Sequence, residues 1–252
     1  MSSSRLHDDP RKLLVEERLA RVANVIPVMS PKGGVGKTVI STLLALAMSE
    51  NDFSVGLLDL DFTNPSIHIV LNLSLNEKPL EDKGIIPPEI HKIKVMSIAY
   101  YTKGRPLPLR GSEITEALRE ILAITIWDDL DYLIIDTPPG MSDVHLEIIN
   151  NVMKPKPLIV TTPHTLSVNS VKFLLTILKE AKTRVLGLVE NMSEKPTDTV
   201  INLCREFSIK YLGNVPLDPL LSLSIGNVSI TKKTRAYSNI TKIINYLKTA
   251  DF

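Results

Sequence analysis

Apolar residues in this chain form short runs that alternate with stretches in which apolar residues recur every three or four positions. Short runs are typical of strands buried in a parallel sheet, whereas the longer spacing is typical of helices packed on such a sheet. The predicted strands are 25–29, 54–59, 93–99, 132–136, 158–162, 184–190 and a short one near 211–212. The predicted helices include 38–48, 112–126, 142–152 and 165–182. Because strands and helices alternate, we expect an α/β fold with one mostly parallel sheet covered by helices on both faces.

Both ends of the chain have a helical pattern. Residues 1–24 are predicted to form an N-terminal helical extension, with a helix at 11–23 whose apolar residues are Leu13, Leu14, Leu19 and Val22. Near the C-terminus, helical spacing is shown by Ile240, Ile243, Ile244 and Leu247, with Lys242 and Lys248 beside them. We interpret that segment as a helix packed on its own domain, and a helix lying on a lipid surface is the alternative. The least regular stretches, 76–91 and 102–111, are candidate mobile regions.

Composition narrows the class of protein. At 252 residues, 44% hydrophobic and 23% charged, the chain can bury a full core and falls in the single-domain range of α/β proteins. No apolar run approaches the roughly 20 residues needed to cross a bilayer, and residues 1–9 lack the apolar core of a signal peptide. We therefore expect a cytoplasmic protein. The formal charge of +1 gives no overall field for nucleic acid.

One local group of basic residues needs an interpretation of its own. The group consists of Arg11, Lys12, Arg18 and Arg21, interleaved with Glu16 and Glu17. We interpret it as a solvated helix face, and a nucleic-acid-binding strip is the alternative. Neither nucleic acid nor membrane is therefore a favoured partner.

Residues 30–38, Ser-Pro-Lys-Gly-Gly-Val-Gly-Lys-Thr, lie between a predicted strand and a predicted helix. Glycines at 33, 34 and 36 permit backbone angles closed to other residues and leave room for phosphate oxygens, so successive N–H groups can converge on an anion. Lys37 is then expected to reach the β- and γ-phosphates, and the Thr38 hydroxyl to ligate magnesium. The strict pattern has glycine where this chain has Pro31, and the alternative is a glycine-rich turn with a chance lysine. The predicted nucleotide contacts in this loop are Gly33, Gly34, Val35, Gly36, Lys37, Thr38 and Val39.

Three carboxylates follow apolar strands and complete the predicted chemistry. Asp61, in the loop after the second strand, is the candidate that orients the attacking water. Asp59 is expected to support Thr38 or the magnesium shell, and Asp136 to be a second magnesium-associated residue. Gly140 is expected to bring its N–H to the γ-phosphate, which makes 137–143 a loop that senses that phosphate. The alternative for the first two acids is a pair of solvated turn aspartates.

The chain resembles a known family in these segments. The loop with two lysines, Lys32 and Lys37, resembles the deviant Walker A motif of the MinD/ParA group of P-loop ATPases. Further segments look like the Mrp branch, whose ATPases are associated with iron–sulfur cluster delivery: 56–61 with Pro65 and Ser66, 131–140 with 143–146, and 189–193. The resemblance extends from about residue 22 to about residue 226.

The resemblance implies a P-loop ATPase domain over 25–252 that binds ATP and Mg²⁺ and hydrolyses ATP slowly, with stimulation by an unknown protein client. It implies an ATP-dependent homodimer in which Lys32 contacts the ATP of the other subunit. It also implies that Asn191 recognises the adenine edge, with Pro216 and Asp218 in the loop that covers the base. The alternatives are a ParA- or MinD-like positioning ATPase that docks on DNA or membrane, and an adaptor with negligible turnover.

One departure from the Mrp branch concerns iron–sulfur clusters. That branch usually has Cys-x-x-Cys shortly after its Asn-Met-Ser segment, so that two subunits supply four thiolates. Here residues 194–204 contain one cysteine, Cys204, which is the single cysteine of the chain. Cys204 is predicted to be a buried thiol in a helix, near Ile201 and Phe207. Cluster carriage by the usual route is therefore not expected. Asp143 and His145 match the branch, and we interpret them as helix-start and packing residues.

Overall fold

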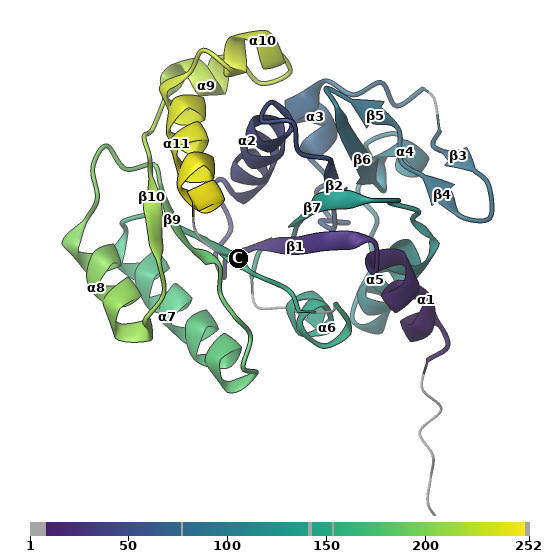
Figure 1. The fold of residues 1–252 in the computed structure, drawn as a ribbon, viewed down its shortest axis with the longest axis horizontal. Coiled ribbons are helices and arrows are strands. Elements are labelled where there is room, and N and C mark those ends of the chain that lie inside the picture. The colour runs from purple at the N-terminus through teal and green to yellow at the C-terminus, as the bar shows by residue number, and fades with distance from the viewer. Residues whose placement is uncertain (1–8, 77, 141–142, 153, 250–252) are drawn as a thin grey trace, which may run out of the picture.

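The computed structural model describes residues 9–76, 78–140, 143–152 and 154–249 (Figure 1). Its strands are β1 (Val22–Met29), β2 (Val55–Asp59), β3 (Leu80–Glu81), β4 (Ile85–Ile86), β5 (Glu89–Ile90), β6 (Ile93–Ser97), β7 (Leu130–Asp136), β8 (Leu158–Thr161), β9 (Gly187–Asn191) and β10 (Tyr211–Val215). Its helices are α1 (Arg11–Leu19), α2 (Lys37–Ser49), α3 (Ile67–Leu71), α4 (Ala99–Thr102), α5 (Ser112–Ile124), α6 (Asp143–Asn151), α7 (Thr165–Glu180), α8 (Asp198–Phe207), α9 (Pro219–Leu223), α10 (Val228–Thr231) and α11 (Arg235–Thr249).

In this part of the chain, one sheet has the strand order β10-β9-β8-β1-β7-β2-β6-β5. All neighbouring pairs are parallel except β5 with β6, and β3 pairs with β4 in a separate antiparallel hairpin. The central strands are buried on both faces, which is why they read as nearly continuous apolar runs. The predicted α/β fold is confirmed.

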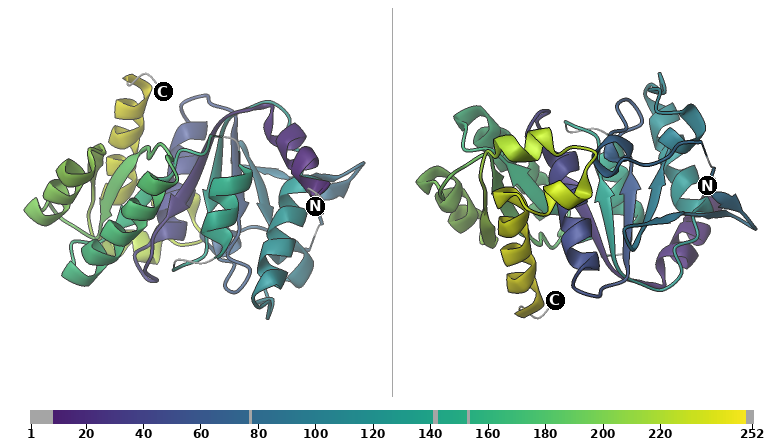
Figure 2. Two further views of the ribbon diagram at one scale, coloured as in Figure 1. Left: turned by 90° about the horizontal axis from the view of Figure 1, so that it is seen from below. Right: turned by 90° about the horizontal axis from the view of Figure 1, so that it is seen from above.

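Helices cover both faces of the sheet, as Figure 2 shows from opposite sides. One hydrophobic core lies between the sheet and α2, α3 and α11, and the other lies between the sheet and α1, α5, α6, α7 and α8. On α11 the four apolar residues with helical spacing are at most 3% exposed, because they pack in the first core. The preferred interpretation of the C-terminal segment is confirmed, and its apolar face is not available to a lipid surface. Within the described ranges, no helix has the length and apolar character needed to span a bilayer.

Several predicted boundaries differ from the structure. Strand β1 begins at Val22, so the predicted helix 11–23 ends earlier, at Leu19. Helix α1 buries Val15 and Leu19, which are one turn apart, whereas Leu13 is 72% exposed and Leu14 43% exposed. The apolar face predicted from those two leucines was wrong. The predicted division between residues 24 and 25 falls inside β1 and stays a prediction.

One predicted strand is shorter than expected, and one stretch predicted to be irregular contains short strands. The predicted strand 93–99 ends at Ser97, because the Ser97 hydroxyl accepts a hydrogen bond from the Ala99 N–H and the chain turns into α4. The stretch 76–91 contains three two-residue strands, β3, β4 and β5, which are too short to leave a periodic pattern.

The N-terminal basic residues are largely occupied by their own chain. Arg11 pairs with Asp9 and Glu116, and Arg21 pairs with Asp129. Arg18 donates hydrogen bonds to two backbone carbonyls, those of residues 83 and 123. These contacts favour the structural interpretation of that group over a nucleic-acid-binding strip.

Candidate functional site

The glycine loop lies between the end of β1 and the start of α2. Gly34 and Gly36 have φ angles of 78° and 82°, a region that glycine enters at little cost. A Cβ on Gly36 would lie 2.3 Å from Nδ2 of Asn191, so no other residue fits there without a shift of that side chain. The predicted strand–loop–helix arrangement is present, and the backbone N–H groups at the start of α2 form the kind of site that binds anions.

Asp136 is the carboxylate that is hydrogen-bonded directly to the end of this loop, through Thr38. It ends β7 beside β1, in register with Val28, which places it next to the first turn of α2. Its Oδ2 accepts a hydrogen bond from the Thr38 hydroxyl at 2.6 Å, and its Oδ1 accepts one from the Ser41 hydroxyl at 3.0 Å. The Lys37 ammonium lies 4.0 Å from Oδ1. Burial raises the pKa of Asp136, and the Lys37 charge and the two hydroxyls oppose that rise.

Asp59 has a different set of partners from the one expected. Oδ1 accepts the Asp61 N–H at 3.1 Å, and Oδ2 accepts the Ser97 hydroxyl at 3.2 Å and the Ile67 N–H at 3.4 Å. Thr38 therefore bonds to Asp136, while Asp59 holds the segment between residues 61 and 67. Burial and the neighbouring Asp136 carboxylate raise the pKa of Asp59 to about 8. Its part in a magnesium shell stays a prediction.

These oxygen atoms fit a magnesium ion. Asp59 and Asp136 end neighbouring parallel strands in direct register, and both side chains are fully buried. Two buried carboxylates with raised pKa values form an electrostatically unfavourable pair that a divalent cation would relieve. Carboxylate, hydroxyl and phosphate oxygens are the ligands that Mg²⁺ takes, so Thr38 and Asp136 are the residues best placed to hold it.

Asp61 lies at the mouth of the same site. It is 7% exposed, and its Oδ1 accepts hydrogen bonds from the Thr63 hydroxyl at 2.8 Å and the Asn64 N–H at 3.0 Å. A pocket of about 210 Å³ is lined by Asp61, Asn64, Pro139 and residues 32–39. The structure thus brings Lys32, the loop residues through Val39 and Asp61 together around one pocket.

The sensing loop is described in part. Gly140 has a φ of 92°, and the neighbouring Pro139 lines the pocket. Residues 141 and 142, and the side chain of Asp143, lie outside the described residues. His145 is fully buried, and its Nε2 lies 3.3 Å from the Thr137 hydroxyl, which itself donates to the Val28 carbonyl. His145 is therefore a buried packing residue, as predicted.

The three residues expected at the adenine base lie in different surroundings. The Asn191 amide donates a 2.7 Å hydrogen bond to the Val35 carbonyl, which fixes the end of β9 against the phosphate loop. Asp218 caps two helices, because its carboxylate accepts the Leu220 N–H of α9 and the Arg235 N–H of α11. Pro216 is buried beside a separate hollow. Base recognition by these residues stays a prediction, with Asn191 alone of the three in contact with the loop.

Sequence reasoning missed Ser41 and Ser97. Ser41 lies three residues after Thr38, hence on the same face of α2, and this spacing was a usable signal for a second hydroxyl on Asp136. Ser97 ends β6 beside Asp59, and only the strand order could reveal that contact.

Cys204 lies in α8 and is 3% exposed, as predicted. Burial, with a smaller contribution from the Glu190 charge, raises the pKa of its thiol to about 11. Thiolates are the ligands of iron–sulfur clusters, and the described residues contain no group of three or more His, Cys, Asp or Glu side chains arranged for a metal. The described residues of one subunit therefore do not supply the thiolate ligands of an iron–sulfur cluster.

Comparison with known proteins matches nearly the whole chain to one family. The family model for ParA, described as NUBPL iron-transfer P-loop NTPase, matches residues 21–249. A Nubp2 homologue from Drosophila simulans, named a cytosolic Fe-S cluster assembly factor, is 35% identical over 249 residues, covering 91% of this chain and 96% of the relative. The corresponding protein of Drosophila pseudoobscura pseudoobscura is 38% identical over 232 residues, covering 84% and 90%.

Solved structures agree with this match. The nucleotide-binding protein from Archaeoglobus fulgidus, determined in complex with ADP, has a TM-score of 0.74 and 33% identity, covering 88% of this chain and 93% of that chain. The septum site-determining protein MinD from Pyrococcus horikoshii, determined with Mg-ADP, has a TM-score of 0.66 and 18% identity, covering 90% and 96%. The MinD likeness supports the fold alone.

Proposed function

Since this chain belongs to the ParA family of NUBPL-type iron-transfer P-loop NTPases, we propose that it is a magnesium-dependent ATPase that switches between ATP and ADP states and serves iron–sulfur cluster assembly. The observation that supports this best is the hydrogen-bonded unit of Thr38, Ser41 and Asp136 beneath the glycine loop. That unit lies at the first turn of α2, where a cation bound to a triphosphate would be held. The curated relatives named as cytosolic Fe-S cluster assembly factors support the pathway and a cytoplasmic location.

Each residue of the site has a role in this proposal. The loop N–H groups bind the phosphates, Lys37 neutralises the β- and γ-phosphate charge, and Thr38 with Asp136 holds Mg²⁺, which would stabilise charge developing on the phosphate oxygens. Asp61 orients the attacking water by accepting a hydrogen bond from it. Its carboxylate is already directed by Thr63 and Asn64, so little reorganisation is needed.

The partner in hydrolysis is proposed to be a second copy of the chain. Lys32 lies in the pocket lining, five positions before Lys37, where it would reach a nucleotide bound by the facing subunit. A positive charge supplied from outside the subunit stabilises the transition state as an arginine finger does. Turnover is then slow in the monomer and rises when a client promotes pairing.

The iron–sulfur cluster in this proposal is cargo that a client protein holds. With one cysteine, buried in α8, the chain itself lacks the thiolates that a shared cluster between two subunits requires. The energy of ATP binding would instead drive a change of shape that the client senses.

Lys32→Ala tests the proposal directly. The variant should still bind ATP and should lose ATP-dependent dimerisation, measured by light scattering, together with at least about tenfold of its phosphate release. Lys37→Ala provides the blank for phosphate release, and Lys12→Ala is the matched exposed cation with no expected effect.

Asp61→Ala should pair in ATP without turning over, because the water-orienting carboxylate is lost while Lys32 remains. A wild-type protein that stays monomeric in ATP, together with a monomeric Asp61→Ala variant, would refute the dimer. Phosphate release that is equal in wild type and Lys37→Ala would refute the ATPase.

A further inference from the structure

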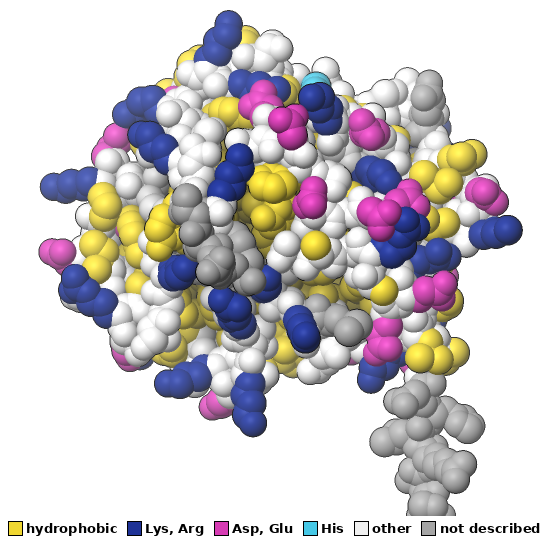
Figure 3. Space-filling model, in the orientation of Figure 1, with side chains coloured by type: hydrophobic (Ala, Val, Ile, Leu, Met, Phe, Trp, Pro, Cys, Tyr) yellow, Lys and Arg dark blue, Asp and Glu magenta, His cyan; other side chains and the backbone are white. Residues whose placement is uncertain are grey.

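A second pocket lies at the opposite end of the strands from the phosphate loop. Its volume is about 360 Å³, and it is located at the amino ends of β8, β9 and β10, between the last turns of α7, α8 and α11. Its lining combines apolar and basic side chains, including Leu175, Phe207, Lys156, Lys179, Arg184 and Lys210. We call it the basic pocket. Figure 3 shows Lys and Arg side chains outnumbering Asp and Glu over the region of α7, α8 and the end of α11.

The basic residues follow the spacing of the sheet. Lys156 precedes β8, Arg184 precedes β9, and Lys210 immediately precedes β10. These strands are neighbours in that order, and adjacent strands lie about 4.8 Å apart. The three strands therefore span about 10 Å, so these basic side chains enter the pocket from three separate strand ends.

Three of these four cations have no acidic partner among the described residues, where Lys179, Arg184 and Lys210 form no ion pair with an acidic side chain. Lys210 lies 5.7 Å above the ring of Tyr246. Lys156 is not a free cation, and its ammonium donates to the side-chain amide oxygen Oδ1 of Asn24 at 2.7 Å. Burial, and then the Arg184 charge, lowers the pKa of Lys156, as expected where like charges gather. The chain as a whole carries only +1, so its charge is unevenly distributed.

Helix ends explain only part of the arrangement. A cation in the last turn of a helix is stabilised by the carbonyl end of the helix dipole, which accounts for Lys179 in α7. That effect fades beyond the last turn, however, and Arg184 lies four residues after the end of α7, while Lys210 lies three residues after the end of α8. A ligand with several separated negative charges is the better explanation for the arrangement.

We propose that the basic pocket binds an acidic segment of a partner protein, which places one large apolar side chain against Leu175 and Phe207 and its flanking carboxylates on Lys179, Arg184 and Lys210. An extended peptide has side chains on one face about 7 Å apart, a repeat between the roughly 4.8 Å that separates adjacent strands and the roughly 10 Å that separates alternate ones. Long Lys and Arg side chains can bridge that difference and reach the carboxylates of alternate residues. The volume holds one aromatic or branched side chain with part of its backbone. Duplex nucleic acid would leave the apolar part of the pocket empty, and a membrane surface would not enter a recessed pocket.

A labelled peptide tests this with the full-length protein. The probe is fluorescein-Asp-Glu-Phe-Glu-Asp, followed by fluorescence anisotropy at low and physiological salt. The expected result is saturable binding that weakens with salt and that is lost when the peptide phenylalanine is replaced by serine. Arg184→Gln and Lys210→Gln should each weaken binding roughly threefold to tenfold. Lys233→Gln, which removes an equal charge from an exposed position outside the pocket, should bind the peptide as wild type does.

Three results would overturn the proposal. The first is no saturable binding up to millimolar peptide, and the second is equal affinity in Arg184→Gln, Lys210→Gln and Lys233→Gln. The third is tighter binding of a fluorescein-labelled DNA duplex that competes with the peptide and depends on the same two cations. Circular dichroism and ATP binding should be unchanged in all variants, so failure here is distinguishable from failure of the proposed ATPase activity.

Discussion

At the scale of single residues, the site depends on which hydrogen-bond partner each buried polar side chain has. Asp136 is fully buried and has two hydroxyl donors and a nearby ammonium, so its charge is partly compensated before any cation binds. Thr38 was identifiable from the loop motif because its position relative to Lys37 is fixed. The contact that completes the unit, Ser41, depends on helix geometry and on the neighbouring strand together.

Ser41→Ala should therefore destabilise the nucleotide-free protein by about 1–3 kcal/mol, because Asp136 loses a donor in a buried site. Urea unfolding measures this. Ser49→Ala is the matched control: Ser49 is also buried in α2, and its hydroxyl has only backbone carbonyl acceptors among the described residues. The Ser41 hydroxyl has both the Lys37 carbonyl and the Asp136 carboxylate within hydrogen-bond distance. The cost of Ser49→Ala should be smaller, and equal costs for the two variants would contradict the assigned role of Ser41.

The Cys204 thiol should react slowly in the folded protein. Its pKa is raised from 9.0 to about 11, so at neutral pH the thiolate fraction falls about a hundredfold relative to an unperturbed cysteine, and burial slows access further. Because the raised pKa means that the folded protein keeps the thiol proton at higher pH, the labelling rate of the folded protein should still rise with pH beyond 9. In urea the labelling rate should level off near pH 9. A disulfide reagent followed by absorbance measures both rates, and fast labelling at pH 7 without urea would contradict burial.

At the scale of elements, buried apolar strands and long helices were predicted well, and short exposed elements were not. The strands that end in Asp59 and Asp136 and the helices α2, α5 and α7 have strong patterns and lie within a few residues of their predicted bounds. The two-residue strand β3 and the five-residue helix α9 bury no residue, so they leave no apolar pattern to recognise. The face of α1 was mispredicted because the helix turns Val15 and Leu19, rather than Leu13 and Leu14, toward the core.

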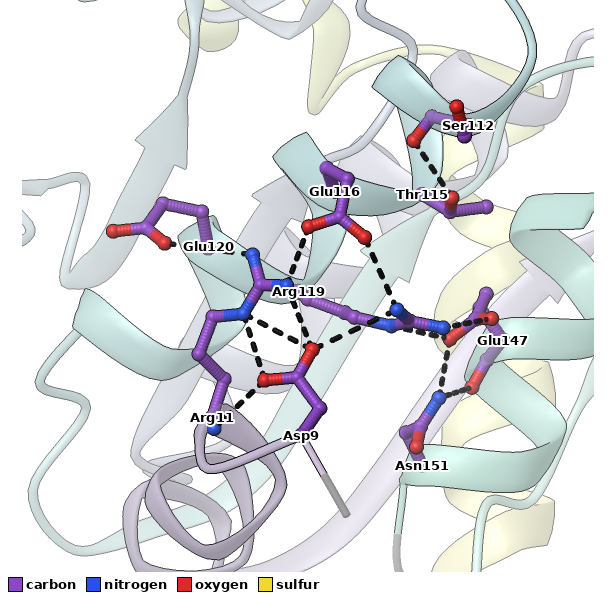
Figure 4. Close-up of polar contacts among 9 residues, drawn as sticks. All are labelled: Asp9, Arg11, Ser112, Thr115, Glu116, Arg119, Glu120, Glu147 and Asn151. Atoms are coloured by element: carbon purple, nitrogen blue, oxygen red, sulfur yellow. Dashed lines mark hydrogen bonds and ion pairs between the residues drawn. The ribbon is translucent and has the colours of Figure 1, made fainter. Parts of the chain in front are cut away.

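Helix α1 is held to α5 and α6 by a network of charged side chains, shown in Figure 4. Arg119 donates to both Glu147 oxygens, at 3.0 and 2.6 Å, and lies 3.6 Å from the Asp9 carboxylate. Arg11 joins Asp9 to Glu116. The network thus links the start of the described chain to the helix that follows the sensing loop.

Arg119→Ala should destabilise the protein by about 0.5–2 kcal/mol, since it removes a bidentate ion pair that is only partly exposed. Amide hydrogen exchange should accelerate in α1 and α6 before it accelerates in β7. Arg205→Ala is the control, because Arg205 is exposed and, among the described residues, its side chain bonds to Asn202 one turn away and to no acidic group. Unchanged exchange in α1 would show that the network does not fasten that helix.

At the scale of the whole molecule, the strand order decides where the chemistry gathers. In the described chain, β1 lies between β8 and β7, and β2 follows β7, so the glycine loop, Asp136 and Asp59 emerge side by side. No local pattern states which strands will be neighbours, so the sequence predicted the residues of the site but not the contacts among them. The same holds for the basic pocket, whose cations are separated by 28 and 26 positions from one strand to the next and meet only through the sheet.

The Asn191 amide has one further consequence. One of its two N–H groups is used by the Val35 carbonyl, which leaves one donor and one acceptor without a hydrogen bond to another described residue. Adenine offers the complementary pair, an amino group at N6 beside the N7 acceptor, whereas guanine offers two acceptors at the same edge. A base held at this amide would therefore be selected as ATP over GTP, by an amide that the loop itself has already oriented.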